Sequence, residues 1–179
     1  MNPYSASPAM NMGSKIGNSM KGSNMELPYC VFDISNNDGS FKLLIDSIYE
    51  GTSETYKKIT VSADFSIQLV IDGINANMEC FLTVGNLYEF FTELNNCYDN
   101  LKGTAMLKYY SPGYTNIFID FNARGGCKVH GEIAAGTGLR SGVKFSIECD
   151  QTYIKPNLRK LKLLFDDFAK IQGSYDFHY

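Results

Sequence analysis

Residues 59–101 read ITVSADFSIQLVIDGINANMECFLTVGNLYEFFTELNNCYDNL, and the spacing of their hydrophobic residues changes near the middle. From Ile59 to Leu69 apolar and polar residues alternate, which is typical of a strand with one buried face. Asp72-Gly73 then predicts a turn into a second strand that ends near Leu82. From Leu87 to Leu101 the apolar residues recur at steps of three and four, which predicts an amphipathic helix.

The predicted helix has signals at both ends. Asn86 is a favourable N-cap, and Glu89 three positions later completes the pattern of a capping box. Gly103 is expected to stop the helix. A second helix is predicted near the end of the chain, with Pro156 near its first position and an apolar stripe that reaches Ile171.

Strand patterns surround the two helices. A hairpin is predicted at residues 29–49, around the turn signal Asn36-Asn37-Asp38-Gly39. Four more strands joined by short links are expected at Thr104–Tyr110, Asn116–Asn122, Cys127–Ile133 and Val143–Cys149. We therefore expect an α+β fold, a twisted and mainly antiparallel sheet of about eight strands with both helices packed on one face.

Composition narrows the class of protein. The chain has 179 residues, 44% of them hydrophobic and 13% aromatic, which excludes an intrinsically disordered protein. No run approaches the ~18 apolar residues of a membrane-spanning helix. Residues 1–25 are rich in Ser, Asn, Gly and Met, and we interpret them as a disordered leader or a start-site artefact. Residues 26–179 are then one domain with 14 basic and 19 acidic side chains, a net charge of −5, which disfavours nucleic-acid binding.

The cysteines indicate a reducing compartment, because their number is odd and no two are spaced as CxxC; they are Cys30, Cys80, Cys97, Cys127 and Cys149. We therefore predict a cytoplasmic protein. The histidines are His130 and His178, too few and too isolated for a zinc site, so we predict no metal and no cofactor.

Candidate catalytic groups each have a simpler explanation. His130 is predicted to point outward from its strand with no nucleophile near it in sequence, and Cys97 lies on the apolar stripe of the first helix. Asp166 and Asp167 fit a solvated helix face, and Asp150 fits a helix cap. We predict no catalytic residue. An enzyme would require His130 or a carboxylate to face a real cleft.

The outward side of the last four predicted strands is the most informative surface. Alternation places there a mixture of apolar and charged side chains: Met106, Lys108, Tyr110, Phe118, Asp120, Lys128, His130, Glu132, Lys144, Ser146 and Glu148. Such a mixture is typical of protein–protein contact surfaces, and also of an ordinary solvated sheet face. The pattern leaves both interpretations open.

Two pairs of motifs resemble a known family. They are FLTVGNLYEFF at 81–91 followed by LKGTA at 101–105, and GCKVHG at 126–131 followed by VKFSIECDQTY at 143–153. In this order they resemble the WapI-family immunity proteins of bacterial contact-dependent and polymorphic toxin systems, over roughly Phe41 to Phe168. The resemblance implies a non-enzymatic protein that binds and neutralises the toxic domain of a delivered toxin. The expected toxin is a nuclease, because nucleases are usually basic and an acidic inhibitor is attracted to them.

We expect the toxin-binding residues to be exposed aromatic and charged side chains. The candidates are Glu50, Glu54, Tyr110, Asp120, His130, Glu132 and Glu148. The alternative is a ligand- or carbohydrate-binding module on the same exposed face, where Tyr110, Tyr114 and Phe118 would stack on a sugar.

Overall fold

The computed structural model describes residues 26–53, 58–80, 82–108, 115–134, 142–173 and Phe177. The predicted leader at 1–25 lies outside these residues. In the described part, eight strands and two helices follow one another as β1 (Tyr29–Asn36), β2 (Gly39–Ser53), β3 (Lys58–Ile71), β4 (Ile74–Cys80), α1 (Val84–Asn100), β5 (Gly103–Lys108), β6 (Thr115–Phe121), β7 (Gly126–Ala134), β8 (Gly142–Asp150) and α2 (Gln151–Gln172). All strand pairs are antiparallel, so the predicted α+β fold is confirmed.

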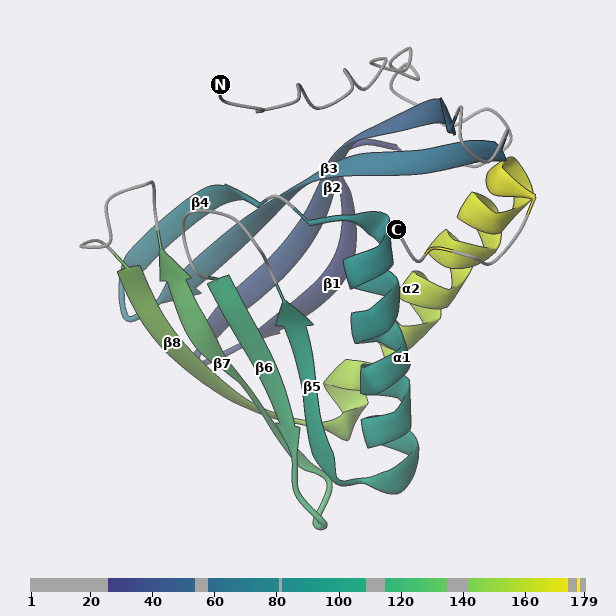
Figure 1. The fold of residues 1–179 in the computed structure, drawn as a ribbon. Coiled ribbons are helices and arrows are strands. Elements are labelled where there is room, and N and C mark those ends of the chain that lie inside the picture. The colour runs from purple at the N-terminus through teal and green to yellow at the C-terminus, as the bar shows by residue number, and fades with distance from the viewer. Residues whose placement is uncertain are drawn as a thin grey trace, which may run out of the picture.

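The strands form two sheets where the sequence suggested one. The first sheet has the order β1-β2-β3-β4 and the second β5-β6-β7-β8, each strand pairing with its neighbour in sequence (Figure 1). The 17-residue helix α1 stands between β4 and β5 and moves the chain to a new position before the second meander begins. Alternation and short links predict which strands are neighbours, but they do not show whether two groups of strands are hydrogen-bonded into one sheet or form two separate sheets.

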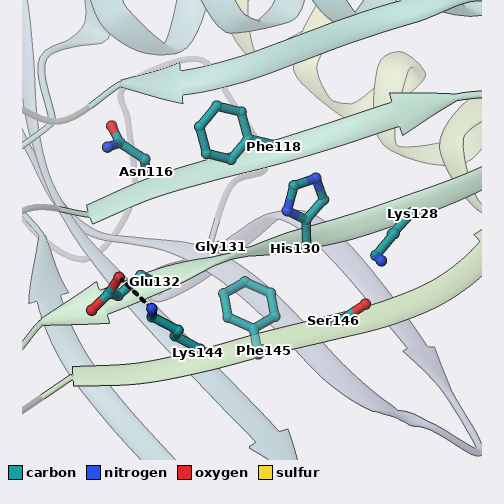
Figure 2. Close-up of a pocket in the computed structure, with 9 residues that line it drawn as sticks. All are labelled: Asn116, Phe118, Lys128, His130, Gly131, Glu132, Lys144, Phe145 and Ser146. Carbon is teal, nitrogen blue, oxygen red and sulfur yellow. Dashed lines mark ion pairs between the residues drawn. The ribbon is translucent and has the colours of Figure 1, made fainter.

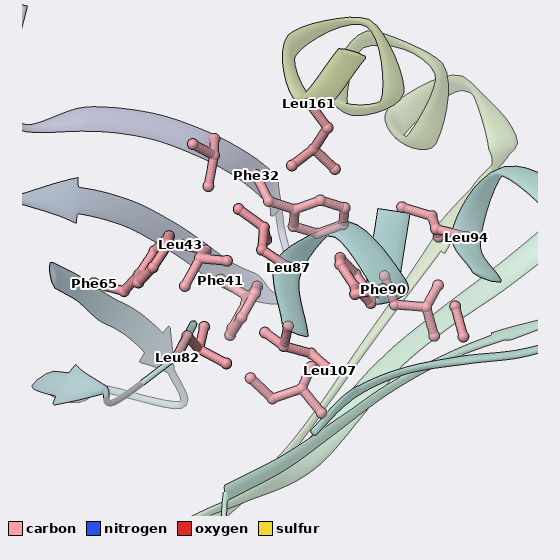
Figure 3. Packing of buried hydrophobic residues seen from close by; sticks show 14 of the residues in the cluster. Phe32, Phe41, Leu43, Phe65, Leu82, Leu87, Phe90, Leu94, Leu107 and Leu161 are labelled. Atoms are coloured by element: carbon pink, nitrogen blue, oxygen red, sulfur yellow. The ribbon is translucent and has the colours of Figure 1, made fainter. Parts of the chain in front are cut away.

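Both helices pack against strands and against each other. α1 lies beside β5, α2 lies against β1 and β3, and the two helices are in contact along one flank of the molecule (Figure 1). One continuous hydrophobic core joins the helices to both sheets. Figure 3 shows side chains converging in it from β1, β2, β3, α1, β5 and α2.

The rings of Phe41 on β2 and Phe145 on β8 connect the two sheets directly. They stack with centroids 5.6 Å apart and planes only 7° apart. The Phe41 ring also meets the edge of Phe32 at 6.1 Å. A side-chain amide makes a second link, because Nδ2 of Asn36 donates to the Glu148 carbonyl oxygen at 2.6 Å.

The helix ends differ from the predictions. The N-cap of α1 is Thr83, and Asn86 is the third helical residue of its capping box, with Asn86 N bonded to Thr83 Oγ1 at 3.0 Å. α1 ends at Asn100, and its C-cap is Leu101, which adopts a left-handed φ of 50° two residues before Gly103. Thr83 makes the better cap because its hydroxyl accepts from Asn86 N while Oδ1 of Asn86 accepts from Thr83 N, so that two amide groups are satisfied reciprocally.

α2 begins five residues earlier than Pro156 suggested, so that proline lies inside the helix. Asp150 is the N-cap, which confirms the capping role predicted for it, and its carboxylate accepts from Thr152 N at 2.7 Å. Hydrogen bonds from the Thr152 hydroxyl and amide lower the pKa of Asp150. A proline in the second turn leaves one helical carbonyl without its amide partner, a cost that the rest of this 22-residue helix outweighs.

Asn157 fastens α2 to β1. It is 1% exposed, and its amide bonds both the backbone N and the backbone O of Asp33 at 2.8 Å, as well as the Tyr153 carbonyl. All of its hydrogen-bonding atoms therefore have partners inside the protein.

Replacing Asn157 by alanine is expected to lower the free energy of unfolding by about 1–3 kcal/mol, because the partly buried backbone N and O of Asp33 lose their partners. Urea unfolding measures the change. Asn96→Ala, at an exposed position of α1, is the control and should leave the midpoint nearly unchanged. Equal stability of the two variants would show that the Asn157 bonds contribute nothing.

Candidate functional site

The second sheet has one buried face and one open face. Its inner face belongs to the core, where Ile119, Val129 and Ile147 are fully buried. We call the opposite side the outer face, and its side chains are all half-exposed or exposed: Thr104, Met106 and Lys108 on β5, Asn116, Phe118 and Asp120 on β6, Lys128, His130 and Glu132 on β7, and Lys144, Ser146 and Glu148 on β8. The strand register aligns them in three rows across the sheet.

The central row contains the apolar part of the outer face. It runs Met106, Phe118, His130, Ser146 from β5 to β8. The Phe118 and His130 rings stack with centroids 5.3 Å apart and planes 20° apart. Figure 2 shows the two rings side by side on adjacent strands.

His130 is held in place from the neighbouring row. Its Nε2 lies 2.8 Å from Oδ2 of Asp120, and Oδ1 of Asp120 accepts from the Thr104 hydroxyl at 2.7 Å. This chain of contacts crosses β5, β6 and β7 and fixes the orientation of the imidazole. It positions a half-exposed aromatic pair at the centre of the sheet.

Charged side chains on the outer face are paired and balanced. Lys128 lies 3.7 Å from Glu148. Lys144 lies 3.7 Å from Glu132, the ion pair that Figure 2 marks with a dashed line. Both ion pairs are largely exposed, so each contributes little to stability. The three lysines of this face offset its three carboxylates, so the net acidity of residues 26–179 is not concentrated here.

A hollow of about 390 Å³ lies on the outer face between the central row and the row that ends at Lys144. Figure 2 shows the residues that line it, which are Asn116, Phe118, Lys128, His130, Gly131, Glu132, Lys144, Phe145 and Ser146. The hollow combines three aromatic residues, Phe118, His130 and Phe145, with side chains of both signs of charge. Chemically, it can receive an apolar or planar group flanked by hydrogen-bonding groups.

The surroundings of Asp120 change the acidity of its carboxyl. Burial acts to raise its pKa, but hydrogen bonds from Thr104 and His130, together with the charges of His130 and Lys128, outweigh this and lower it. The carboxylate form is therefore favoured by its surroundings.

Asp120→Asn is expected to reduce stability slightly, by less than about 1 kcal/mol, because the pair is partly exposed. A carboxyl whose pKa is lower in the folded than in the unfolded state stabilises the protein at pH values above its unfolded-state pKa of about 4. This stabilisation is lost as the pH falls through the folded-state pKa. The difference between wild type and variant should thus be largest above about pH 5 and shrink below about pH 4. Urea unfolding across this range tests the sign, and a difference that grows on acidification would contradict it.

The structure brings together four of the predicted site residues, Asp120, His130, Glu132 and Glu148, on the outer face. Glu50 is separate, since it lies on β2 of the first sheet opposite Val61. Glu54, Tyr110 and Tyr114 lie outside the described residues. Sequence reasoning missed Thr104, which orients Asp120, although the alternation that placed Met106 on this face also places Thr104 there.

Glu93 on α1 has a structural role in the second sheet. Its Oε2 accepts from the backbone N of Met106 at 2.9 Å, which occupies an amide on the edge strand β5. Edge amides of this kind otherwise remain open to pairing with another chain. Helix α1 therefore protects this edge of the second sheet.

The alternative catalytic groups are placed as their structural explanations predicted. Cys97 is buried in the core, and burial raises the pKa of its thiol, which disfavours a nucleophilic role. Asp166 and Asp167 form ion pairs along α2 with Lys162 and Lys170. In the described part of the chain, no group of three or more His, Cys, Asp or Glu residues is placed to hold a metal ion. None of the described helices is long and apolar enough to cross a membrane.

Comparison with known proteins identifies the family. The model of the immunity protein WapI-like family matches residues 33–169, which extend from β1 to α2. The chain belongs to this family. Among curated proteins no match was found. The WapI-like match confirms the resemblance seen in the motifs, and it includes every residue of the outer face.

Proposed function

We propose that this WapI-like protein is a non-enzymatic immunity protein that acts in the cytoplasm, where it binds and neutralises the toxic domain of a bacterial contact-dependent toxin. Membership of the immunity protein family is the observation that carries the proposal. The match spans both sheets and both helices, so it concerns the whole described fold and not one local motif.

The outer face of the second sheet is the surface we assign to the toxin. It combines a central aromatic pair with a rim of charged and polar side chains, the arrangement found where proteins meet. Specific interfaces engage about 20–30 residues on each side. The outer face is smaller than that, so it would form the centre of the interface and adjoining segments would complete it.

A nuclease remains the toxin class we favour. Residues 26–179 carry a net charge of −5, and a basic nuclease domain would be attracted to such a protein. The outer face itself is balanced, so the attraction would come from the molecule as a whole and would mainly raise the association rate. Raising the salt concentration should then slow association while changing the dissociation rate little.

Co-expression with the toxin domains encoded beside this gene tests the function. The full chain, tagged and purified, should retain its cognate toxin domain and restore growth of cells that produce it. Toxin domains from unrelated systems are the control for specificity. If every neighbouring toxin domain fails to bind and none is neutralised, the proposed function is wrong.

The hollow supports a second candidate, a ligand- or carbohydrate-binding module. Its volume of about 390 Å³ is within the usual range for small-molecule sites, and the Phe118 ring could stack on a sugar. A glycan array distinguishes the two candidates. Binding of a glycan that disappears in Phe118→Ala would favour the module, and an array without binding would remove it.

A further inference from the structure

Two cysteines face each other across the last two strands. The β7–β8 register places Cys127 directly opposite Cys149, and both are free thiols. Directly opposite residues of an antiparallel pair have Cα atoms about 4.5–5.5 Å apart. Disulfides join residues with Cα atoms about 4.4–6.8 Å apart, so the backbone already has the spacing that such a bond requires.

The other three cysteines have different neighbours. Cys30 is paired with Leu44 and Cys80 with Phe65, while Cys97 is on the buried side of α1. All five cysteines lie in the described part of the chain. Among the five cysteines, only Cys127 and Cys149 therefore lie opposite each other in a strand pair.

The two side chains interact and differ in access. Interaction between the two sulfurs lowers the pKa of Cys127 and, together with burial, raises the pKa of Cys149. Cys127 is 2% exposed, whereas Cys149 is partly exposed. A small oxidant can thus approach the pair from the Cys149 side.

We propose that Cys127 and Cys149 form an oxidisable dithiol site, which a hydroperoxide converts to a disulfide between β7 and β8. One of the two sulfurs attacks the O–O bond as a thiolate and becomes a sulfenic acid, while the leaving oxygen departs as hydroxide or an alkoxide. The other sulfur then attacks the sulfenic sulfur, and its proton leaves with the sulfenic oxygen as water. The two sulfurs lose two electrons in total, and the peroxide bond gains them.

The bond would form behind the outer face, because both thiols lie on the opposite side of the ladder from Lys128 and Glu148. It would tether the two strands that hold half of the outer-face residues without removing any of them. The inference rests on the strand register and the free thiols, and it is independent of the proposed partner.

Thiol counting after oxidation tests the site in the full-length protein. The reduced chain, denatured and alkylated with N-ethylmaleimide, should carry five labels, one for each cysteine. After treatment of the folded protein with hydrogen peroxide, two labels should be lost, and dithiothreitol should restore both. Peptide mapping should show one cross-link, between the peptides that contain Cys127 and Cys149.

Serine variants supply the controls. Cys149→Ser and Cys127→Ser should each abolish the cross-link, and Cys149→Ser keeps the test valid if the more buried position does not tolerate serine. Cys30→Ser is the matched control, since Cys30 is also partly exposed on a strand but has leucine opposite it. It should still form the cross-link. Retention of all five labels, a cross-link between other cysteines, or oxidation that dithiothreitol does not reverse would overturn the proposal.

Discussion

Phe118→Ala is expected to weaken binding of the cognate toxin domain about 30-fold or more, which corresponds to about 2 kcal/mol. Phe118 is at the centre of the outer face, stacked on His130 and flanked by polar side chains that would exclude water from a contact. Truncation of a central aromatic residue is the type of change that costs most in protein interfaces. Calorimetry or surface plasmon resonance with the purified toxin domain measures the loss.

Leu163→Ala is the matched control for this prediction. Leu163 is a large apolar residue with 62% exposure, and it lies on α2, away from the outer face. Its variant should bind the toxin domain with unchanged affinity. Urea unfolding of both variants verifies that they remain folded. If Phe118→Ala binds as tightly as wild type, the toxin contacts another surface, although the immunity function itself would still stand.

Phe41→Ala is expected to lower the free energy of unfolding by about 3–5 kcal/mol. Phe41 is 2% exposed and lies between the sheets, stacked on Phe145 and in edge contact with Phe32. Its removal leaves a cavity at the junction that the two rigid sheets cannot easily close. Urea unfolding, followed by circular dichroism, measures the loss.

Val70→Ala on β3 is the control for the core substitution, because that side chain is 41% exposed and should change stability by less than about 0.5 kcal/mol. A loss for Phe41→Ala of less than about 1.5 kcal/mol would mean that the junction repacks, and that the two sheets are not held together by this ring pair.

Much of the fold could be predicted because the signals are local. The alternation from Ile59 to Leu69 became β3, and the three- and four-residue steps from Leu87 became α1. The helix ends were predicted less well, since Thr83 and Asn86 are both capable caps of α1, and Pro156 suggested a later start for α2 than the one that Asp150 caps. Alternation within the strand predicted at Cys127–Ile133 correctly placed His130 and Glu132 on an outward surface.

The site could be predicted only in part, since it is built across strands. That Asp120, His130 and Thr104 would form one chain of contacts depends on the β5–β6–β7 register, which no single strand encodes. The stacking of Phe118 on His130 has the same origin. Glu93 likewise depends on a neighbouring element, because its carboxylate on α1 accepts a hydrogen bond from a backbone amide of the edge strand β5.

By itself, the amino-acid sequence determined the number and type of the elements, the buried side of each, and the resemblance to the WapI-like family, because hydrophobic period and short motifs are properties of neighbouring residues. Tertiary structure alone decided that the strands divide into two sheets, that Phe41 and Phe145 join them, and that Cys127 faces Cys149. These features depend on contacts between residues far apart in the chain, and such contacts are settled only when the whole core packs.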